Sequence, residues 1–272
     1  MNVYFHEKLD LKKYIIRYII CLIPLYLYGF YKNGIVLYNK DYISFLSMFK
    51  IFYLLILSLI SYFLTNKILK KKINFDLVFL SLFIIPLFMP YHINIILYFL
   101  IISISLLFRK YYNVALIILI LSLFNNFKNP AEEANIYAFS TWDLLWGRNI
   151  GGIGSTSIIL GILIGIILIF TNNYKYLVVI GGLLSFIIIS IIFKDYNYLT
   201  NGNAILTILF VASIPNKSPV LKKYMFIYGL LIGIIGFILM KFLNPYYGMV
   251  LSITIINIIY NVAEKKKALP VK

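Results

Sequence analysis

Residues 154–171 read GSTSIILGILIGIILIFT, and after a short turn residues 176–193 read YLVVIGGLLSFIIISIIF. Neither run contains a charged residue, and each is close to the ~20 residues that a helix needs to cross a bilayer. The apolar residues are continuous, whereas the strands of a membrane β-barrel alternate apolar and polar residues. Backbone groups inside a bilayer must bond to one another, which favours helices. These two runs therefore predict two membrane-spanning helices.

The rest of the chain repeats this pattern. Of the 272 residues, 62% are hydrophobic and 12% are charged, about half the charged fraction of a soluble domain. The composition predicts an all-α polytopic membrane protein. Several of its expected spans are short for a ~30 Å hydrocarbon core, and short, proline-interrupted spans are typical of folds with broken helices. We expect ten spans, near residues 14–31, 42–65, 76–89, 92–108, 113–126, 154–171, 176–193, 202–215, 224–242 and 246–262.

The formal net charge is +16, from 25 Lys and Arg against 9 Asp and Glu. Basic residues collect in cytoplasmic loops of membrane proteins. With ten spans and the N-terminus inside, 18 of the 25 fall on the cytoplasmic side. This predicts a multi-pass protein of the cell membrane with both termini cytoplasmic. The clusters Lys70–Lys72 and Lys265–Lys267 are expected to contact anionic lipid headgroups of the bilayer. No nucleic-acid partner is expected, because no segment combines a basic face with soluble periodicity.

Metal chemistry is not expected from this sequence. The single cysteine, Cys21, cannot form a disulfide or a cysteine-based metal site within the chain. His6 and His92 have no Asp, Glu or Cys neighbours at the spacing of metal ligands. We therefore predict no metal site and no catalytic residue.

A long connecting segment divides the expected spans into two sets of five. It runs over residues 127–153, on the extracytoplasmic side, and its tryptophans Trp142 and Trp146 are predicted to be interfacial anchors. The predicted organisation is a first five-helix repeat over 1–126, this connecting loop, and a second five-helix repeat over 154–272.

Paired prolines indicate that the two sets are related. Pro86 and Pro90 interrupt the third expected span, and Pro215 and Pro219 interrupt the eighth, which is its counterpart. Because an odd number of spans separates them, the two repeats would have inverted topology, and interrupted segments in such repeats indicate a site near the midplane. The alternative is that both pairs are helix ends followed by turn prolines.

An ordered set of motifs in the second half resembles a known family. The resemblance covers residues 143–264, and the family is RnfD/NqrB. Its members are membrane subunits of ion-translocating Rnf complexes and of sodium-pumping NADH:quinone reductases. The motifs are Asp143–Gly147 (DLLWG), Gly151–Ser157 (GGIGSTS), Gly161, Gly165, Ala212–Pro215 (ASIP), Ser218-Pro219, Gly229, Gly233, Gly236, and Tyr247-Gly248 before Asn257.

The resemblance implies an architecture, partners and a cofactor. It implies ten helices in two inverted five-helix repeats, similar to urea transporters, and other membrane subunits of an electron-transfer complex as partners. It also implies FMN, esterified to a threonine of the connecting loop, with riboflavin as a further possibility. Thr141 is the candidate threonine here, with polar Asn135 six positions before it. An interfacial threonine beside Trp142 is the alternative.

Further candidate cofactor-binding residues lie at the start of the sixth span and near the end of the eighth. A helix N-terminus preceded by glycines can hold an anion such as a flavin phosphate. Close helix packing explains the same glycines. The candidates are Gly154, Ser155, Thr156, Ser157 and Ser213.

Two acidic residues of the family are missing. Its Gly-Glu-Thr-Ser is GSTS at 154–157, and its Ala-Thr-Asp-Pro is ASIP at 212–215. Carboxylates inside a membrane are usually retained for ion or cofactor work, so their loss argues against cation movement of the family's kind. The leading hypothesis is a membrane subunit of an Rnf- or Nqr-like complex that binds or positions a flavin for transmembrane or quinone-directed electron transfer. Such a chain would be at most one subunit of a multi-subunit oxidoreductase. The alternatives are a small-solute transporter or channel on the same scaffold, and a structural subunit without a cofactor.

Overall fold

Every regular element in the described part of the chain is a helix, and none is a strand. The expected all-α class is therefore confirmed. The computed structural model describes residues 8–125, 140–149, 151–171, 175–214, 218–219 and 221–267.

Several helices of the first half begin where a side chain satisfies a free backbone N–H group. Asp76, Asn94 and Asn113 each accept from the first turn of the helix that follows. The first helix is interrupted by a π-helical turn and then continues. The elements are α1 (Lys8–Phe30), η1 (π-helix, Tyr31–Ile35), α2 (Val36–Tyr38), α3 (Phe45–Met48), α4 (Lys50–Ile68), α5 (Leu77–Ile84), η2 (3₁₀ helix, Ile85–Phe88), α6 (Ile95–Leu107), η3 (3₁₀ helix, Arg109–Tyr111) and α7 (Val114–Leu123).

The second half follows the same capping rule. Ser140, Ser157 and Asn201 cap the helices that begin after them. A π-helical segment again forms part of one apolar helix, here its C-terminal half. The elements are α9 (Thr141–Trp146), α10 (Ile158–Phe170), α11 (Tyr176–Ile192), η4 (3₁₀ helix, Tyr196–Thr200), α12 (Gly202–Leu206), η5 (π-helix, Thr207–Ala212), α13 (Lys222–Phe242) and α14 (Gly248–Lys267).

Each of the ten expected spans overlaps an apolar helix. Among the described residues, three helices are long and apolar enough to cross a membrane: Leu11–Tyr38, Lys50–Ile68 and Lys222–Phe242. That all ten segments cross the membrane, and that they form two inverted repeats, stays a prediction. The shorter apolar helices are Leu77–Phe88, Ile95–Leu107, Val114–Leu123, Ile158–Phe170, Tyr176–Ile192, Gly202–Ala212 and Gly248–Tyr260.

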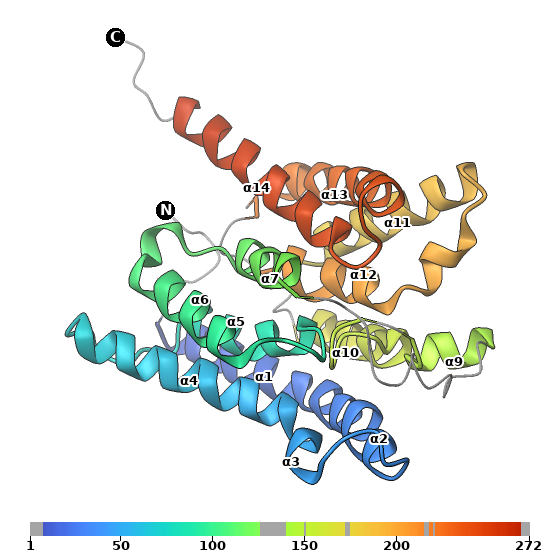
Figure 1. The fold of residues 1–272 in the computed structure, drawn as a ribbon. Helices are drawn as coiled ribbons and strands as arrows, with labels where there is room; N and C mark the ends of the chain where they lie inside the picture. The colour runs from blue at the N-terminus through green and yellow to red at the C-terminus, as the bar shows by residue number, and fades with distance from the viewer. Residues whose placement is uncertain are drawn as a thin grey trace.

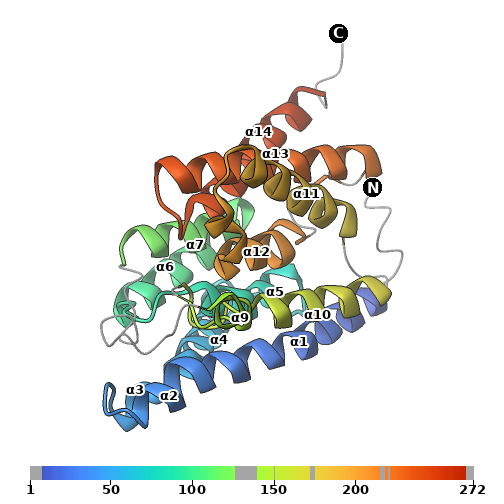
Figure 2. The ribbon, with the colours of Figure 1, turned by 90° about the vertical axis from the view of Figure 1, so that its right-hand side faces the viewer.

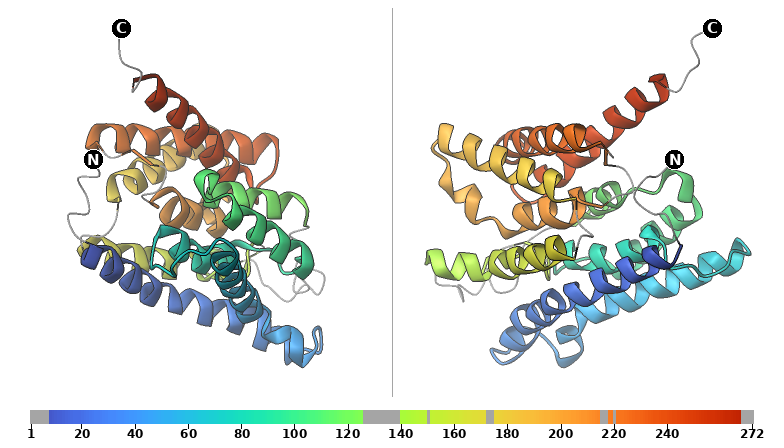
Figure 3. Two further views of the ribbon diagram at one scale, coloured as in Figure 1. Left: turned by 90° about the vertical axis from the view of Figure 1, so that its left-hand side faces the viewer. Right: turned by 180° about the vertical axis from the view of Figure 1, so that it is seen from behind.

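The two halves interlock. In Figure 1, α1 and α4 lie on one side of the molecule and α11, α13 and α14 on the other. The turned view of Figure 2 shows α10, from the second half, running beside α1, and the two helices are in contact. In the same way α7, from the first half, contacts α14 (Figure 3). One apolar core therefore includes residues from both halves.

The outer surface carries many large apolar side chains. Ile20, Ile104 and Ile188, on three different helices, are each more than half exposed. A soluble protein would bury most of these side chains, whereas a lipid-facing surface exposes them. Their distribution fits a helical membrane protein.

The interruption of the third expected span lies at Pro86, as the prolines predict, and the sixth expected span begins later than predicted. η2 contains Pro86 and ends at extended Met89, whereas Pro215 lies outside the described residues. The sixth apolar helix begins at Ile158 rather than at residue 154. Residues 151–157 remain irregular, because their backbone groups bond to other segments instead of continuing the helix.

Candidate functional site

The irregular segment before α10, residues 151–157, is completely buried. Ser155, Thr156 and Ser157 are all 0% exposed. Irregular backbone is tolerated at membrane depth only where protein or a water-filled cavity surrounds it. Its polar groups must therefore be satisfied by other parts of the chain. We call this segment and the residues that bond to it the central crossing.

The break in the third apolar helix supplies the first set of partners. The N–H of Ile153 donates to the carbonyl of Met89 at 2.8 Å, and the N–H of Gly154 donates to that of Leu87 at 2.9 Å. A Cβ on Gly152 would lie 2.6 Å from the Leu87 carbonyl oxygen. Glycine at this position therefore permits the close approach of two irregular backbones.

The π-helical turn of the first apolar helix supplies the second set. Nζ of Lys32 donates to the carbonyl of Asn149 at 2.7 Å and to Oγ1 of Thr156 at 2.9 Å. Nδ2 of Asn33 donates to the carbonyl of Ile153 at 2.7 Å. Lys32 and Asn33 are 2% and 3% exposed. A buried lysine and a buried asparagine thus hold residues that lie more than a hundred positions further along the chain.

The start of α12 supplies the third set. Oγ of Ser155 donates to Oδ1 of Asn203, and Nδ2 of Asn203 donates to the carbonyl of Tyr246 at 2.7 Å. A Cβ on Gly202 would overlap the carbonyl oxygen of Thr156. The turn between α13 and α14 is therefore tied to the central crossing through one buried amide.

Four of the predicted cofactor-binding residues meet in this crossing, and two do not. Gly154, Ser155 and Thr156 contact Leu87, Asn203 and Lys32 respectively, and Ser157 caps α10 by accepting from the N–H of Leu160 at 3.4 Å. The crossing therefore brings Gly154 to Ser157 together.

Ser213 and Thr141 lie away from the crossing. Ser213 is buried at the far end of η5 and donates to the Leu209 carbonyl of its own helix. The ten residues from Asn203 to Ser213 correspond to roughly 15 Å along a helix. Thr141 is the exposed first residue of α9. Asn135, the polar residue that precedes it in the flavin motif, lies outside the described residues.

The short helix α9 has its own polar contacts. Ser140 caps it, and Arg148 forms an exposed ion pair with Asp143 at 2.8 Å. The hydrogen bond from Ser140 holds the pKa of Asp143 below its usual value. Trp142 is 67% exposed and Trp146 49% exposed, and their role as interfacial anchors stays a prediction.

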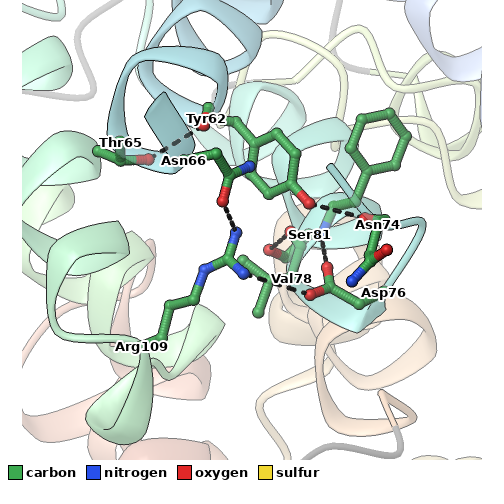
Figure 4. A network of polar contacts seen from close by, with 9 residues as sticks. Tyr62, Thr65, Asn66, Asn74, Asp76, Val78, Ser81 and Arg109 are labelled. Atoms are coloured by element: carbon green, nitrogen blue, oxygen red, sulfur yellow. Dashed lines mark hydrogen bonds and ion pairs between the residues drawn. The ribbon is translucent and has the colours of Figure 1, made fainter. Parts of the chain in front are cut away.

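A second, partly buried polar cluster joins the end of α4, the start of α5 and η3 (Figure 4). Nη2 of Arg109 donates to Oδ1 of Asn66 at 2.9 Å, and Nη1 lies 3.8 Å from Oδ2 of Asp76. The guanidinium also lies over the Tyr62 ring, 5.1 Å from its centroid. This arginine belongs to the basic end of the bundle that also carries Lys70 to Lys72. Its contacts hold three helix ends together.

A small cavity lies between the two halves, away from the central crossing. Its volume is about 10 Å³, room for about one water molecule. The hydroxyl of Tyr228 at its wall donates to Oδ1 of Asn257 at 2.6 Å. A flavin would not fit there. The wall consists of Asn113, Val114, Ala115, Val211, Ala212, Ile214, Ser218, Tyr228 and Asn257.

Sequence reasoning misses the residues that hold the crossing from the first half. It predicts no site role for Lys32 or Asn33, nor for Asn203 in the second half. A charged residue inside the long apolar run Leu11–Tyr38 is the available signal, because such residues are costly in a membrane and usually functional.

Comparison with known proteins identifies relatives of the second half and the end of the first. The profile of the NQR2, RnfD, RnfE family matches residues 114–267. The NqrB-type component of the Na(+)-translocating NADH-quinone reductase of Chlamydia felis is 30% identical in an alignment of 143 residues, and the match covers 44% of this chain and 28% of that protein. This chain therefore matches less than a third of the length of that relative. The range that matches the family profile, residues 114–267, includes residues 151–157, Asn203 and Tyr246 of the central crossing.

Proposed function

This chain belongs to the NQR2, RnfD, RnfE family, and we propose that it is a membrane subunit of an Rnf- or Nqr-type electron-transfer complex. In this role it binds or positions a flavin, and other membrane subunits of the complex are its partners. The flavin would carry the electrons, and the protein would supply its orientation and electrostatic surroundings.

The observation that carries this proposal is the place of the family match in the structure. The matched residues 114–267 supply the buried irregular segment 151–157 and the asparagine that anchors it. The unmatched first half supplies the two interrupted helices that receive this segment. The buried segment and its asparagine anchor therefore come from the sequence that the chain shares with its family, while the helices that receive the segment come from residues before 114.

The described residues favour Thr141 over the central crossing as a flavin-attachment site. The Thr141 hydroxyl is exposed, so an ester bond to FMN can form there without unfolding any element. Trp142 beside it is exposed and provides an apolar surface for a flavin ring. The hydroxyls of Ser155 and Thr156 are instead engaged by Asn203 and Lys32.

Mass spectrometry of the intact protein, purified from cells that make an FMN-attaching enzyme, tests this proposal. We expect an FMN-sized adduct that maps to Thr141 and a fluorescent band after denaturing electrophoresis. Thr141→Val should abolish both signals, while the matched control Ser140→Ala should keep them. Protein with neither a covalent adduct nor extractable riboflavin or FMN would contradict the flavin role.

A structural subunit without a cofactor is the second candidate, and the closed central crossing favours it. Each described hydroxyl at residues 155–157 bonds to another group of the chain. In that case the protein would copurify with partner subunits and contain no flavin. A solute channel, the third alternative, would instead make liposomes that contain the pure protein permeable to urea-sized solutes.

A further inference from the structure

Lys32 places an amino group inside the first long apolar helix. The residue is 2% exposed and lies within the Leu11–Tyr38 span. An ammonium at such a position is costly unless fixed polar groups replace the water that it loses. The surroundings of Nζ therefore indicate what this lysine does.

Two of the atoms that accept hydrogen bonds from Lys32 are oxygens of the irregular region before α10. They are the carbonyl oxygen of Asn149 at 2.7 Å and Oγ1 of Thr156 at 2.9 Å. Carbonyl and hydroxyl oxygens from unwound backbone are also the groups that coordinate small monovalent cations inside membrane proteins, where they replace the hydration shell. The oxygens around Nζ thus have the chemistry of a cation site.

The chain constructs this arrangement from both sides. Lys32, Asn33 and Gly34 are three consecutive buried residues, and the π-helical turn that contains them turns all three inward. The amide of Asn33 fixes the carbonyl of Ile153. On the other side Gly147 has φ +92°, and a Cβ there would lie 2.5 Å from the backbone N of Ser157. Ile153 and Ser157, which lie on either side of Thr156 in the chain, are therefore fixed by contacts that do not involve the lysine.

We propose that the Lys32 ammonium is a tethered cation, which fills a site whose oxygens would otherwise take a small monovalent cation. The chain then carries its own charge at the central crossing and needs no exchangeable ion there. A cation of this kind cannot be transported. This inference does not depend on the proposed electron-transfer role or on a bound flavin.

Chemical rescue of Lys32→Ala tests the proposal in the full chain purified in detergent. Thermal unfolding is measured at one ionic strength in tetramethylammonium, sodium or n-butylammonium chloride. We expect Lys32→Ala to lower the midpoint by several degrees in tetramethylammonium, which has no N–H donor. n-Butylammonium should restore much of this loss, and sodium part of it. Neither ion should shift the wild type or the exposed control Lys40→Ala.

Two results would overturn the proposal. One is a Lys32→Met variant that is as stable as the wild type in tetramethylammonium, which would mean that the ammonium fills no needed site. The other is an equal response of Lys32→Ala and Lys40→Ala to n-butylammonium, which would mean that the ion acts on the detergent or the surface.

A second variant keeps the inference testable if Lys32→Ala does not fold. Thr156→Val keeps the shape of the side chain and removes one oxygen ligand, so it should lower the midpoint by a few degrees. In a double-mutant cycle, Thr156→Val should cost much less in the Lys32→Met background, because the hydroxyl has then lost the ammonium. Additive losses would contradict the proposed contact.

Discussion

Two neighbouring regions of this chain differ in the range of their polar contacts. The short helix α9 (141–146) is exposed, and the bonds of Asp143 reach only Ser140 and Arg148. The central crossing begins a few residues later, is fully buried, and bonds to groups as far away as Lys32, 124 positions along the chain. The polar contacts of α9 are therefore local, whereas those of the crossing form only once both halves have folded together.

This difference determines how much stability a substitution should cost in each region. Polar groups at the crossing have no water to replace a lost partner, so each removal leaves a buried donor or acceptor unsatisfied. The exposed groups of α9 regain hydrogen bonds from water. Substitutions of similar chemistry should therefore have large effects in one region and small effects in the other.

The largest expected effect is that of Gly202→Ala. The new Cβ would overlap the backbone carbonyl of Thr156, which cannot rotate away. We expect a destabilisation at or above the ~3 kcal/mol upper end of ordinary overpacking, seen as loss of monodisperse protein or a much lower unfolding midpoint. Gly161→Ala is the matched control, because its nearest neighbours are flexible side-chain atoms of Leu206. Equal stability of the two variants would contradict the close approach.

Asn203→Ala should have the next largest effect. It leaves the Tyr246 carbonyl without its donor and Ser155 without its acceptor, and each buried unsatisfied group costs roughly 1–3 kcal/mol. The unfolding midpoint in detergent measures this loss. The exposed Asn39→Ala is the control and should be unchanged. If both variants have the unfolding midpoint of the wild type, the Asn203 amide does not anchor the crossing.

Lys175 offers an intermediate case, a long-range contact near the surface. Its Nζ donates to both oxygens of Ser218 and to the Pro219 carbonyl, and burial lowers its pKa from 10.5 to about 8. The folded chain then binds this proton less tightly than the unfolded chain. Stability should therefore rise between pH 8 and 10.5.

The comparison of wild type with Lys175→Met isolates this effect. As the pH rises through this window, the unfolding midpoint of the wild type should increase relative to that of Lys175→Met. The exposed Lys40→Met should follow the wild type throughout. A constant difference between wild type and Lys175→Met across the window would refute the lowered pKa.

The smallest effect is expected at α9. Asp143→Asn removes the ion pair with Arg148 and weakens the cap with Ser140, but both groups are in contact with solvent and exposed pairs contribute little. We expect no measurable change in the unfolding midpoint. A loss comparable to that of Asn203→Ala would mean that α9 is held by the rest of the molecule.

The sequence predicts the helices better than it predicts their partners. Apolar runs locate the segments, because a helix in a bilayer satisfies its own backbone, and the prolines locate the interrupted third helix at Pro86. The GSTS stretch at 154–157 stands out in the sequence as unusual. The sequence nevertheless predicts that it lies inside a helix, because its bonds to Leu87 and Met89 depend on a segment more than sixty residues away.

The missed residues share one physical cause. Lys32 and Asn33 bond to residues of the other half, and Asn203 bonds to residues more than forty positions away in its own half. A single sequence contains no pairing information for such distant contacts. Periodicity identifies which side of a helix is apolar but not which carbonyl an asparagine will meet. The family motif points to Thr141, and only the structure places it on an exposed helix.

Sidedness labelling tests the central claim most directly. The claim is that α9 lies on the extracytoplasmic side of the membrane and that the basic helix ends lie on the cytoplasmic side. In a Cys21→Ser background, single cysteines are introduced as Trp142→Cys and Lys70→Cys, and intact cells are treated with a membrane-impermeant maleimide. The account predicts that Trp142→Cys is labelled at once and Lys70→Cys only after the cells are permeabilised. Labelling of both from the same side would contradict the inverted arrangement and the flavin-binding role proposed for Thr141.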